Sequence, residues 1–75
     1  MTLTMIVTKT DDGFTAEVPS IKGCESWAHD EDTVIDKTLD LAAFYLKLPH
    51  PYFAINKVRK EKNKIFYKII FNKKQ

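Results

Sequence analysis

Cysteine and histidine are the residue types in this chain best suited to nucleophilic or metal chemistry, and they are few. The 75 residues include one cysteine, Cys24, and two histidines, His29 and His50. In an uninterrupted strand, residues 24 and 29 would point to opposite faces, so we do not expect a Cys–His dyad. A free cysteine beside Gly23 is typical of a buried packing position. Three such ligands at irregular spacing do not form a structural zinc pattern.

Other catalytic signatures are missing from the sequence. It has no serine in a Gly-x-Ser-x-Gly setting, and its two glycines, Gly13 and Gly23, cannot form a Gly-rich phosphate loop. The prolines on both sides of His50, Pro49 and Pro51, indicate a rigid loop rather than a positioned base. We therefore expect a protein that is not an enzyme and that uses no metal or cofactor.

Two groups of charged residues are candidates for binding. Asp32, Asp36 and Asp40 follow an i, i+4, i+8 spacing, which places them in one stripe along a helix. Such a stripe is either a solvated face or a docking surface for a basic partner, because facing charges steer association.

The second group is basic and lies at the other end of the chain. Residues 1–56 carry four Lys and nine Asp or Glu, a net charge of −5, whereas residues 57–75 carry seven Lys and one Arg against one Glu, a net charge of +7. Lysines flanking β segments guard against edge-to-edge pairing. The alternative is nucleic-acid binding, in which basic side chains contact phosphates while Tyr52 or Phe53 stacks on bases. The basic residues in that interpretation are Lys57, Arg59, Lys60, Lys62 and Lys64.

The first half of the chain must position these groups. Residues 2–10 alternate with apolar side chains on both faces, which predicts a central strand. Asp11-Asp12-Gly13 predicts a turn into a second strand that ends at Pro19. Residues 24–28 predict a third strand with Trp27 on the face opposite Cys24. Trp27 either caps the core or anchors an interface; we favour the interface, because charged neighbours share its face.

A helix from about residue 31 to about residue 47 follows, with Asp30 as its N-cap. Its apolar stripe should close against the sheet, and Pro49 and Pro51 should end it. The stripe comprises Val34, Ile35, Leu39, Leu41, Ala42, Tyr45, Leu46 and Leu48.

The last third predicts two strands, about 52–58 and about 64–72. The chain is then one domain over residues 1–75, a two-layer α+β fold of order β-β-β-α-β-β with one helix on a mostly antiparallel sheet. One helix leaves the other sheet face without cover, so we expect a homo-oligomer. We find no apolar run near the roughly 20 residues that span a bilayer and no signal peptide, which favours a cytoplasmic protein without membrane contact.

The stretch from Gly13 to Asp32 resembles the HicB antitoxin family, in Phe14, Ala16, Val18-Pro19, Gly23-Cys24 and the Asp30 cap. The resemblance covers roughly residues 3–48. It implies a partial ribonuclease-H-like fold that binds and silences HicA, a small basic RNA-cleaving toxin. The chain departs from the family at Ala28-His29, where Gly-Asp is common, and at Thr33-Val34, where Glu-Ala is usual.

Two family properties are not expected here. The segment after the helix leaves no room for a helix-turn-helix or ribbon-helix-helix, so DNA binding is not carried over. Nuclease activity of the ribonuclease-H kind needs a carboxylate on the first strand, and Leu3 to Lys9 has none. The sequence therefore predicts a protein-binding, antitoxin-like module or an orphan relative of one. The alternative is a small RNA-binding protein acting through its basic 57–64 loop.

Overall fold

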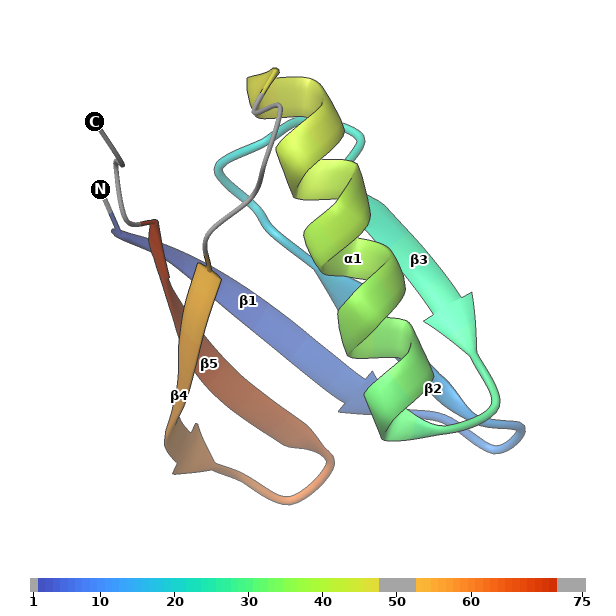
Figure 1. Cartoon of the computed structure of the whole chain (residues 1–75). Helices are drawn as coiled ribbons and strands as arrows, with labels where there is room; N and C mark the ends of the chain where they lie inside the picture. Colours follow the sequence, from blue (N-terminus) through green and yellow to red (C-terminus); the bar gives the residue numbers. More distant parts are fainter. Residues whose placement is uncertain (1, 48–52, 72–75) are drawn as a thin grey trace.

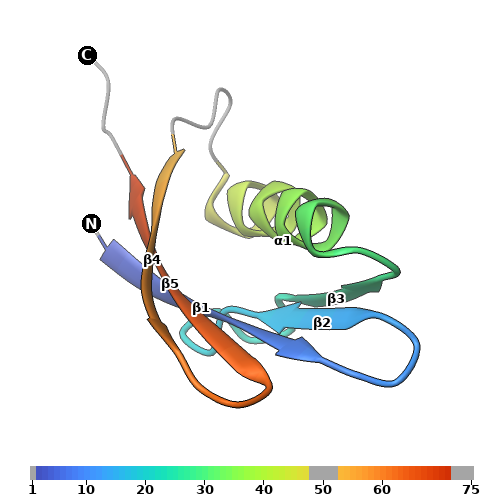
Figure 2. The ribbon, with the colours of Figure 1, turned by 90° about the horizontal axis from the view of Figure 1, so that it is seen from below.

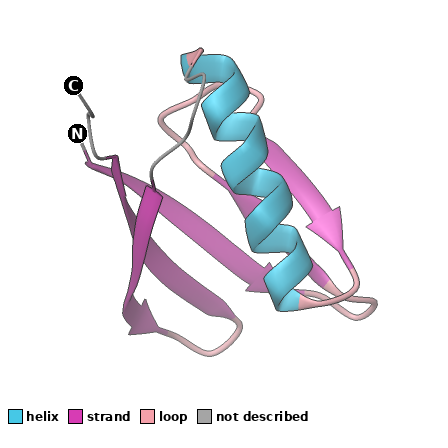
Figure 3. Cartoon of the chain, in the orientation of Figure 1, coloured by secondary structure: helices cyan, strands magenta, loops and turns pink. Residues whose placement is uncertain are grey.

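The computed structural model describes residues 2–47 and 53–71, and it confirms the predicted α+β class and element order (Figure 1, Figure 3). One helix packs on one face of a single sheet. The elements are β1 (Thr2–Lys9), β2 (Phe14–Glu17), β3 (Glu25–Ala28), α1 (Glu31–Leu46), β4 (Phe53–Lys60) and β5 (Lys64–Phe71).

The five strands follow the order β3-β2-β1-β5-β4, and all neighbouring pairs are antiparallel. β1 lies in the middle, which confirms the predicted central strand. β5 lies between β1 and β4, so its backbone is paired on both sides. Figure 2 shows that α1 lies over β2 and β3 and that the β4–β5 half of the sheet bends toward the helix side.

The observed bounds differ from the predicted ones by small amounts. α1 ends at Leu46, and Lys47 follows it in the left-handed conformation with φ 58°, donating its N–H to the carbonyls of Ala43 and Phe44. β4 extends to Lys60, two residues beyond the predicted strand. Some predicted positions lie outside the described residues. They are the two prolines expected to end the helix, Pro49 and Pro51, the stripe residue Leu48 and the loop residue His50.

The core forms between α1 and the sheet face beneath it. Alternation along β1 and β5 points every second side chain toward the helix side, and from Leu3 to Val7 and from Ile65 to Ile69 these side chains are apolar or aromatic. Within the predicted helix stripe, Val34, Ile35 and Ala42 are buried, whereas Tyr45 is 44% exposed and lies over Gly23. The other large buried side chains include Met5, Val7, Val18, Ile65, Tyr67 and Ile69.

Local contacts fix the connection between β3 and α1. Asp30 caps the helix as predicted: its carboxylate accepts hydrogen bonds of 2.9 Å from the N–H and the hydroxyl of Thr33. The β1–β2 turn packs closely against this connection, because a Cβ at Gly13 would lie 2.3 Å from the carbonyl oxygen of Ala28. Only glycine fits at that position without a backbone shift.

Candidate functional site

A shallow groove of about 350 Å³ runs between α1 and the edge strand β3. Ser26 contributes to it because strand alternation turns this residue toward the helix. The helix contributes Lys37, Leu41 and Phe44, which follow an i, i+4, i+7 spacing, together with Asp40. Phe44 is 74% exposed, the largest value among the described large hydrophobic residues. The groove thus combines an uncovered aromatic ring with one ammonium and one carboxylate.

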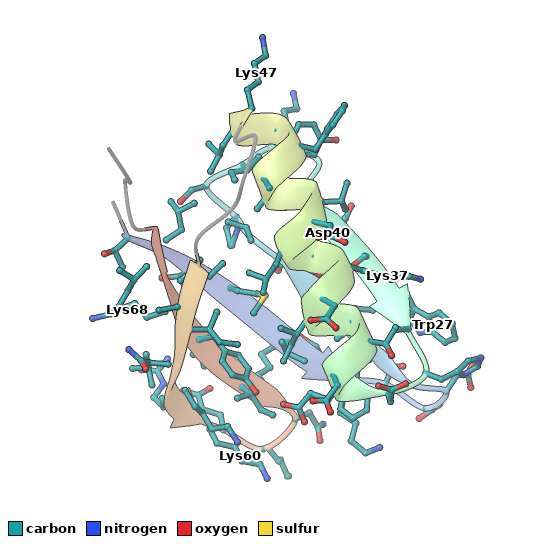
Figure 4. The ribbon with its side chains drawn as sticks, viewed as in Figure 1. Trp27, Lys37, Asp40, Lys47, Lys60 and Lys68 are labelled. Atoms are coloured by element: carbon teal, nitrogen blue, oxygen red, sulfur yellow. The ribbon has the colours of Figure 1, made fainter. Side chains whose placement is uncertain are left out.

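Two sets of hydrogen bonds hold the floor and rim of the groove. The Ser26 and Thr38 hydroxyls lie 2.7 Å apart, and Thr38, fully buried, also donates to the carbonyl of Val34 at 2.7 Å. At the rim, Lys37 Nζ donates to the carbonyl of Trp27 at 3.1 Å. Figure 4 shows Lys37, Asp40 and Trp27 together on the β3 side of the molecule. These bonds keep the edge strand and the helix at a fixed separation.

Trp27 lies at the same edge, but its side chain belongs to the other sheet face. Its strand neighbour Ser26 faces the helix, so Trp27 faces away from it. The indole is 41% exposed, and the ring of His29 meets it edge-on with centroids 4.6 Å apart. Trp27 therefore does not cap the core between helix and sheet.

The three predicted helix carboxylates are all exposed, but only one lines the groove. Asp40 lies at the groove, whereas Asp32 and Asp36 lie elsewhere on the solvent side of α1. Within residues 2–47 and 53–71, the sole ion pair joins Arg59 to Glu61, at 3.1 Å. The helix acids thus have no cationic partner among the described side chains.

The predicted basic residues do not share one surface, because β4 contains a bulge between Lys57 and Arg59. Lys57 pairs with Tyr67 and Lys60 with Ile65, so both lie on the helix side of the sheet. Arg59 and Lys64 lie on the outer face, away from the helix. Lys62 lies in the β4–β5 turn, and the predicted stacking residues, Tyr52 and the Phe53 side chain, fall outside the described part.

Several residues of these surfaces were not singled out from the sequence. Phe44 could have been identified from the sequence as an exposed aromatic residue, because it lies outside the apolar stripe of the helix. On the outer face, the Arg59 guanidinium lies 4.4 Å from the centroid of the Phe66 ring, and Lys68 is exposed two residues further along β5. Phe66 and Lys68 had no comparable signal, because their partners depend on strand pairing.

The two candidate nucleophilic residues are not brought together. Cys24 is buried against α1, with its Sγ 3.8 Å from the carbonyl oxygen of Thr38, and burial raises the pKa of its thiol. A thiol with a raised pKa is a poor nucleophile at neutral pH. His29 is exposed, its Nδ1 3.4 Å from the carbonyl oxygen of Asp12. The described side chains also include no group of three His, Cys, Asp or Glu close enough to bind a metal ion.

Comparisons of this chain with protein-family models, with curated proteins and with solved structures gave no match. In the part of the chain that the structure describes, no helix has the length and apolar character needed to cross a membrane.

Proposed function

We propose that this protein is a non-catalytic binding module, resembling HicB antitoxins, that docks a basic partner protein on the groove side of α1. The partner class is a small basic RNA-acting toxin of the HicA kind, unless the chain is an orphan relative that binds another basic protein. One observation carries the proposal: the exposed ring of Phe44 lies beside the carboxylate of Asp40 along a groove.

The two side chains would act in different ways. A large aromatic side chain that becomes buried on binding supplies much of the affinity of an interface. A carboxylate steers a positively charged partner and fixes its orientation. Asp36 and Asp40 extend this negative field along α1, and neither has a cationic partner among the described residues.

Binding kinetics with a catalytically inactive HicA-type toxin as the probe would test the proposal. We expect Asp36→Lys with Asp40→Lys to slow association about tenfold and to weaken its salt dependence. We expect Phe44→Ser to act mainly by faster dissociation.

Two matched controls separate this site from general effects. Asp11→Lys with Asp12→Lys makes the same charge change in the β1–β2 turn, and Val58→Ser truncates another exposed apolar side chain, 59% exposed on β4. Both control variants should bind as the wild type does. Equal losses in the controls and in the groove variants would contradict a docking site on α1.

RNA binding is a second candidate function, favoured by the Arg59–Phe66 stack and by Lys64 and Lys68 on the same sheet face. If RNA is the ligand, changing Lys60, Lys62 and Lys64 to Ser lowers the affinity for a single-stranded oligonucleotide and flattens its salt dependence. The Asp36 and Asp40 changes would then be neutral or slightly favourable. RNA binding becomes the preferred function if the lysine variant loses RNA affinity while the Asp changes do not affect binding of the toxin probe.

A further inference from the structure

Five residues form a single row across the outer face of the sheet, one from each strand. The strand registers pair Ile6 with Glu17 and with Phe66. Glu17 is in turn opposite Glu25, and Phe66 is opposite Arg59. In strand order β3-β2-β1-β5-β4, the row reads Glu25, Glu17, Ile6, Phe66, Arg59. It therefore begins with two acids, is apolar in the middle and ends with a base.

No described segment covers this face, because α1 packs on the opposite one (Figure 2). Ile6, Phe66 and Ile70 are each partly exposed on it. Lys64 and Lys68 add positive charge to the β5 side of the row. The face thus has a small apolar centre among the threonines of β1, with acids on one side of it and bases on the other, and this charge order allows two copies to be complementary.

We propose that a second copy of this chain packs on the outer face, related to the first by a twofold axis parallel to β1. Such an axis places the Ile6 side chains of the two copies against each other. It also places β2 and β3, which carry Glu17 and Glu25, over β5 and β4 of the second copy, which carry Lys64, Lys68 and Arg59. Both charged contacts occur twice, as a self-complementary interface requires.

The charge order favours this axis over a twofold axis perpendicular to the strands. An axis perpendicular to the strands would place β3 over β3 and β4 over β4. Acids would then face acids and bases would face bases, which is unfavourable across an interface. The row therefore determines the orientation of the second copy as well as the face that it covers.

The same row favours a second copy over RNA as the occupant of this face. A nucleic acid presents negative charge along its whole backbone. Glu17 and Glu25 occupy the β2–β3 side of the face and would repel it. A second copy instead presents positive charge to those acids, and its own acids to Arg59 and Lys68.

The size of the face predicts a weak association. Five strands spaced about 4.8 Å apart give a width of about 24 Å. With a usable length of roughly 20 Å, the face would bury at most on the order of 500 Å² per copy, because its β4–β5 half bends toward the helix side and so away from the second copy (Figure 2). This area is below the roughly 800 Å² of a standard stable interface. We therefore expect a dimer that forms and dissociates within an accessible concentration range.

Charge exchange between two variants tests both the face and the axis. The first variant is E17K/E25K, and the second is R59E/K68E. Each alone faces like charges across the proposed interface, so we expect each to dimerise at least tenfold more weakly than the wild type in sedimentation equilibrium. In an equimolar mixture, the contacts of residues 17 and 25 with residues 59 and 68 become complementary again, and we expect a mixed dimer with affinity within about threefold of the wild type.

The control variant D11K/D12K makes the same charge change as E17K/E25K but in the β1–β2 turn, and it should dimerise as the wild type does. Circular dichroism verifies that every variant is folded. The proposal is overturned if the wild type remains at 8.7 kDa from micromolar to millimolar concentration. It is also overturned if the folded mixture does not associate. A monomeric wild type that binds oligouridine, with loss of that affinity in R59E/K68E, would instead assign this face to RNA.

Discussion

Tyr67 and Glu31 are 36 residues apart in the sequence, yet the Tyr67 hydroxyl donates a hydrogen bond of 2.5 Å to the Glu31 carboxylate. This bond joins β5 to the first turn of α1, and so connects the C-terminal hairpin to the helix. Burial of the phenol, the bond to Glu31 and the negative charges of Glu31 and Asp32 together raise the pKa of Tyr67 well above its usual value of 10.0.

The raised pKa of Tyr67 predicts loss of stability in alkaline solution. The folded state holds the phenolic proton more tightly than the unfolded state does. The stability that protonated Tyr67 contributes is therefore complete below pH 10 and decreases as the pH rises above 10. We expect Tyr67→Phe to lower the free energy of unfolding at pH 7 by about 1–2 kcal/mol. The variant should then lose less further stability between pH 10 and 11.5 than the wild type does. Urea unfolding at several pH values measures both effects, and parallel pH profiles would contradict the prediction.

The Ser26–Thr38 pair predicts a strongly non-additive mutant cycle. Thr38→Val leaves the Ser26 hydroxyl without its partner at the floor of the groove, so it should destabilise the protein by about 1–3 kcal/mol. The double variant with Ser26→Ala removes both hydroxyls and should recover most of that loss. Denaturant unfolding of the four proteins measures the coupling; additive effects would show that the two hydroxyls do not depend on each other.

The Asp30 cap predicts an acid-dependent contribution to helix stability. The N–H and then the hydroxyl of Thr33, by bonding the carboxylate, lower the pKa of Asp30 below its usual value of 3.8. The stability that this group adds is therefore present above pH 3.8 and is lost as the pH falls through the lower folded-state pKa. Asp30→Asn keeps a capping side chain that does not titrate. Its thermal midpoint should be close to that of the wild type at pH 7 and should fall less steeply below pH 4.

Lys47 predicts a stabilising substitution at the end of α1. Of the described residues other than glycine, it alone has a positive φ, 58°. Glycine adopts this conformation without steric cost, so Lys47→Gly should raise the free energy of unfolding by about 0.5–1 kcal/mol. As a control, Asp36→Gly within the exposed side of the helix should lower it by about 1 kcal/mol. Equal losses in both variants would show that the left-handed cap is not a source of strain.

Local signals in the sequence predicted most of the elements but not the distribution of the basic residues. Alternation alone would place Lys57 and Arg59 on one face, because they are two positions apart. The bulge between them inserts one extra residue, so Lys57 lies on the helix side and Arg59 stacks on Phe66 on the outer side. The basic residues that we expected to act together in a 57–64 loop are thus divided between two faces.

The sequence by itself determined the features that depend on near neighbours along the chain. These are the element order, the turn at residues 11–13, the central position of β1 and the Asp30 cap, each indicated by side-chain alternation, turn-forming residue types or a hydrogen bond three residues away. Only the tertiary structure decided that β5 lies between β1 and β4. That pairing brings Phe66 beside Ile6 and completes the row from Glu25 to Arg59. The physical reason is that a strand's neighbours depend on contacts between distant segments, and alternation reports only which side chains share a face.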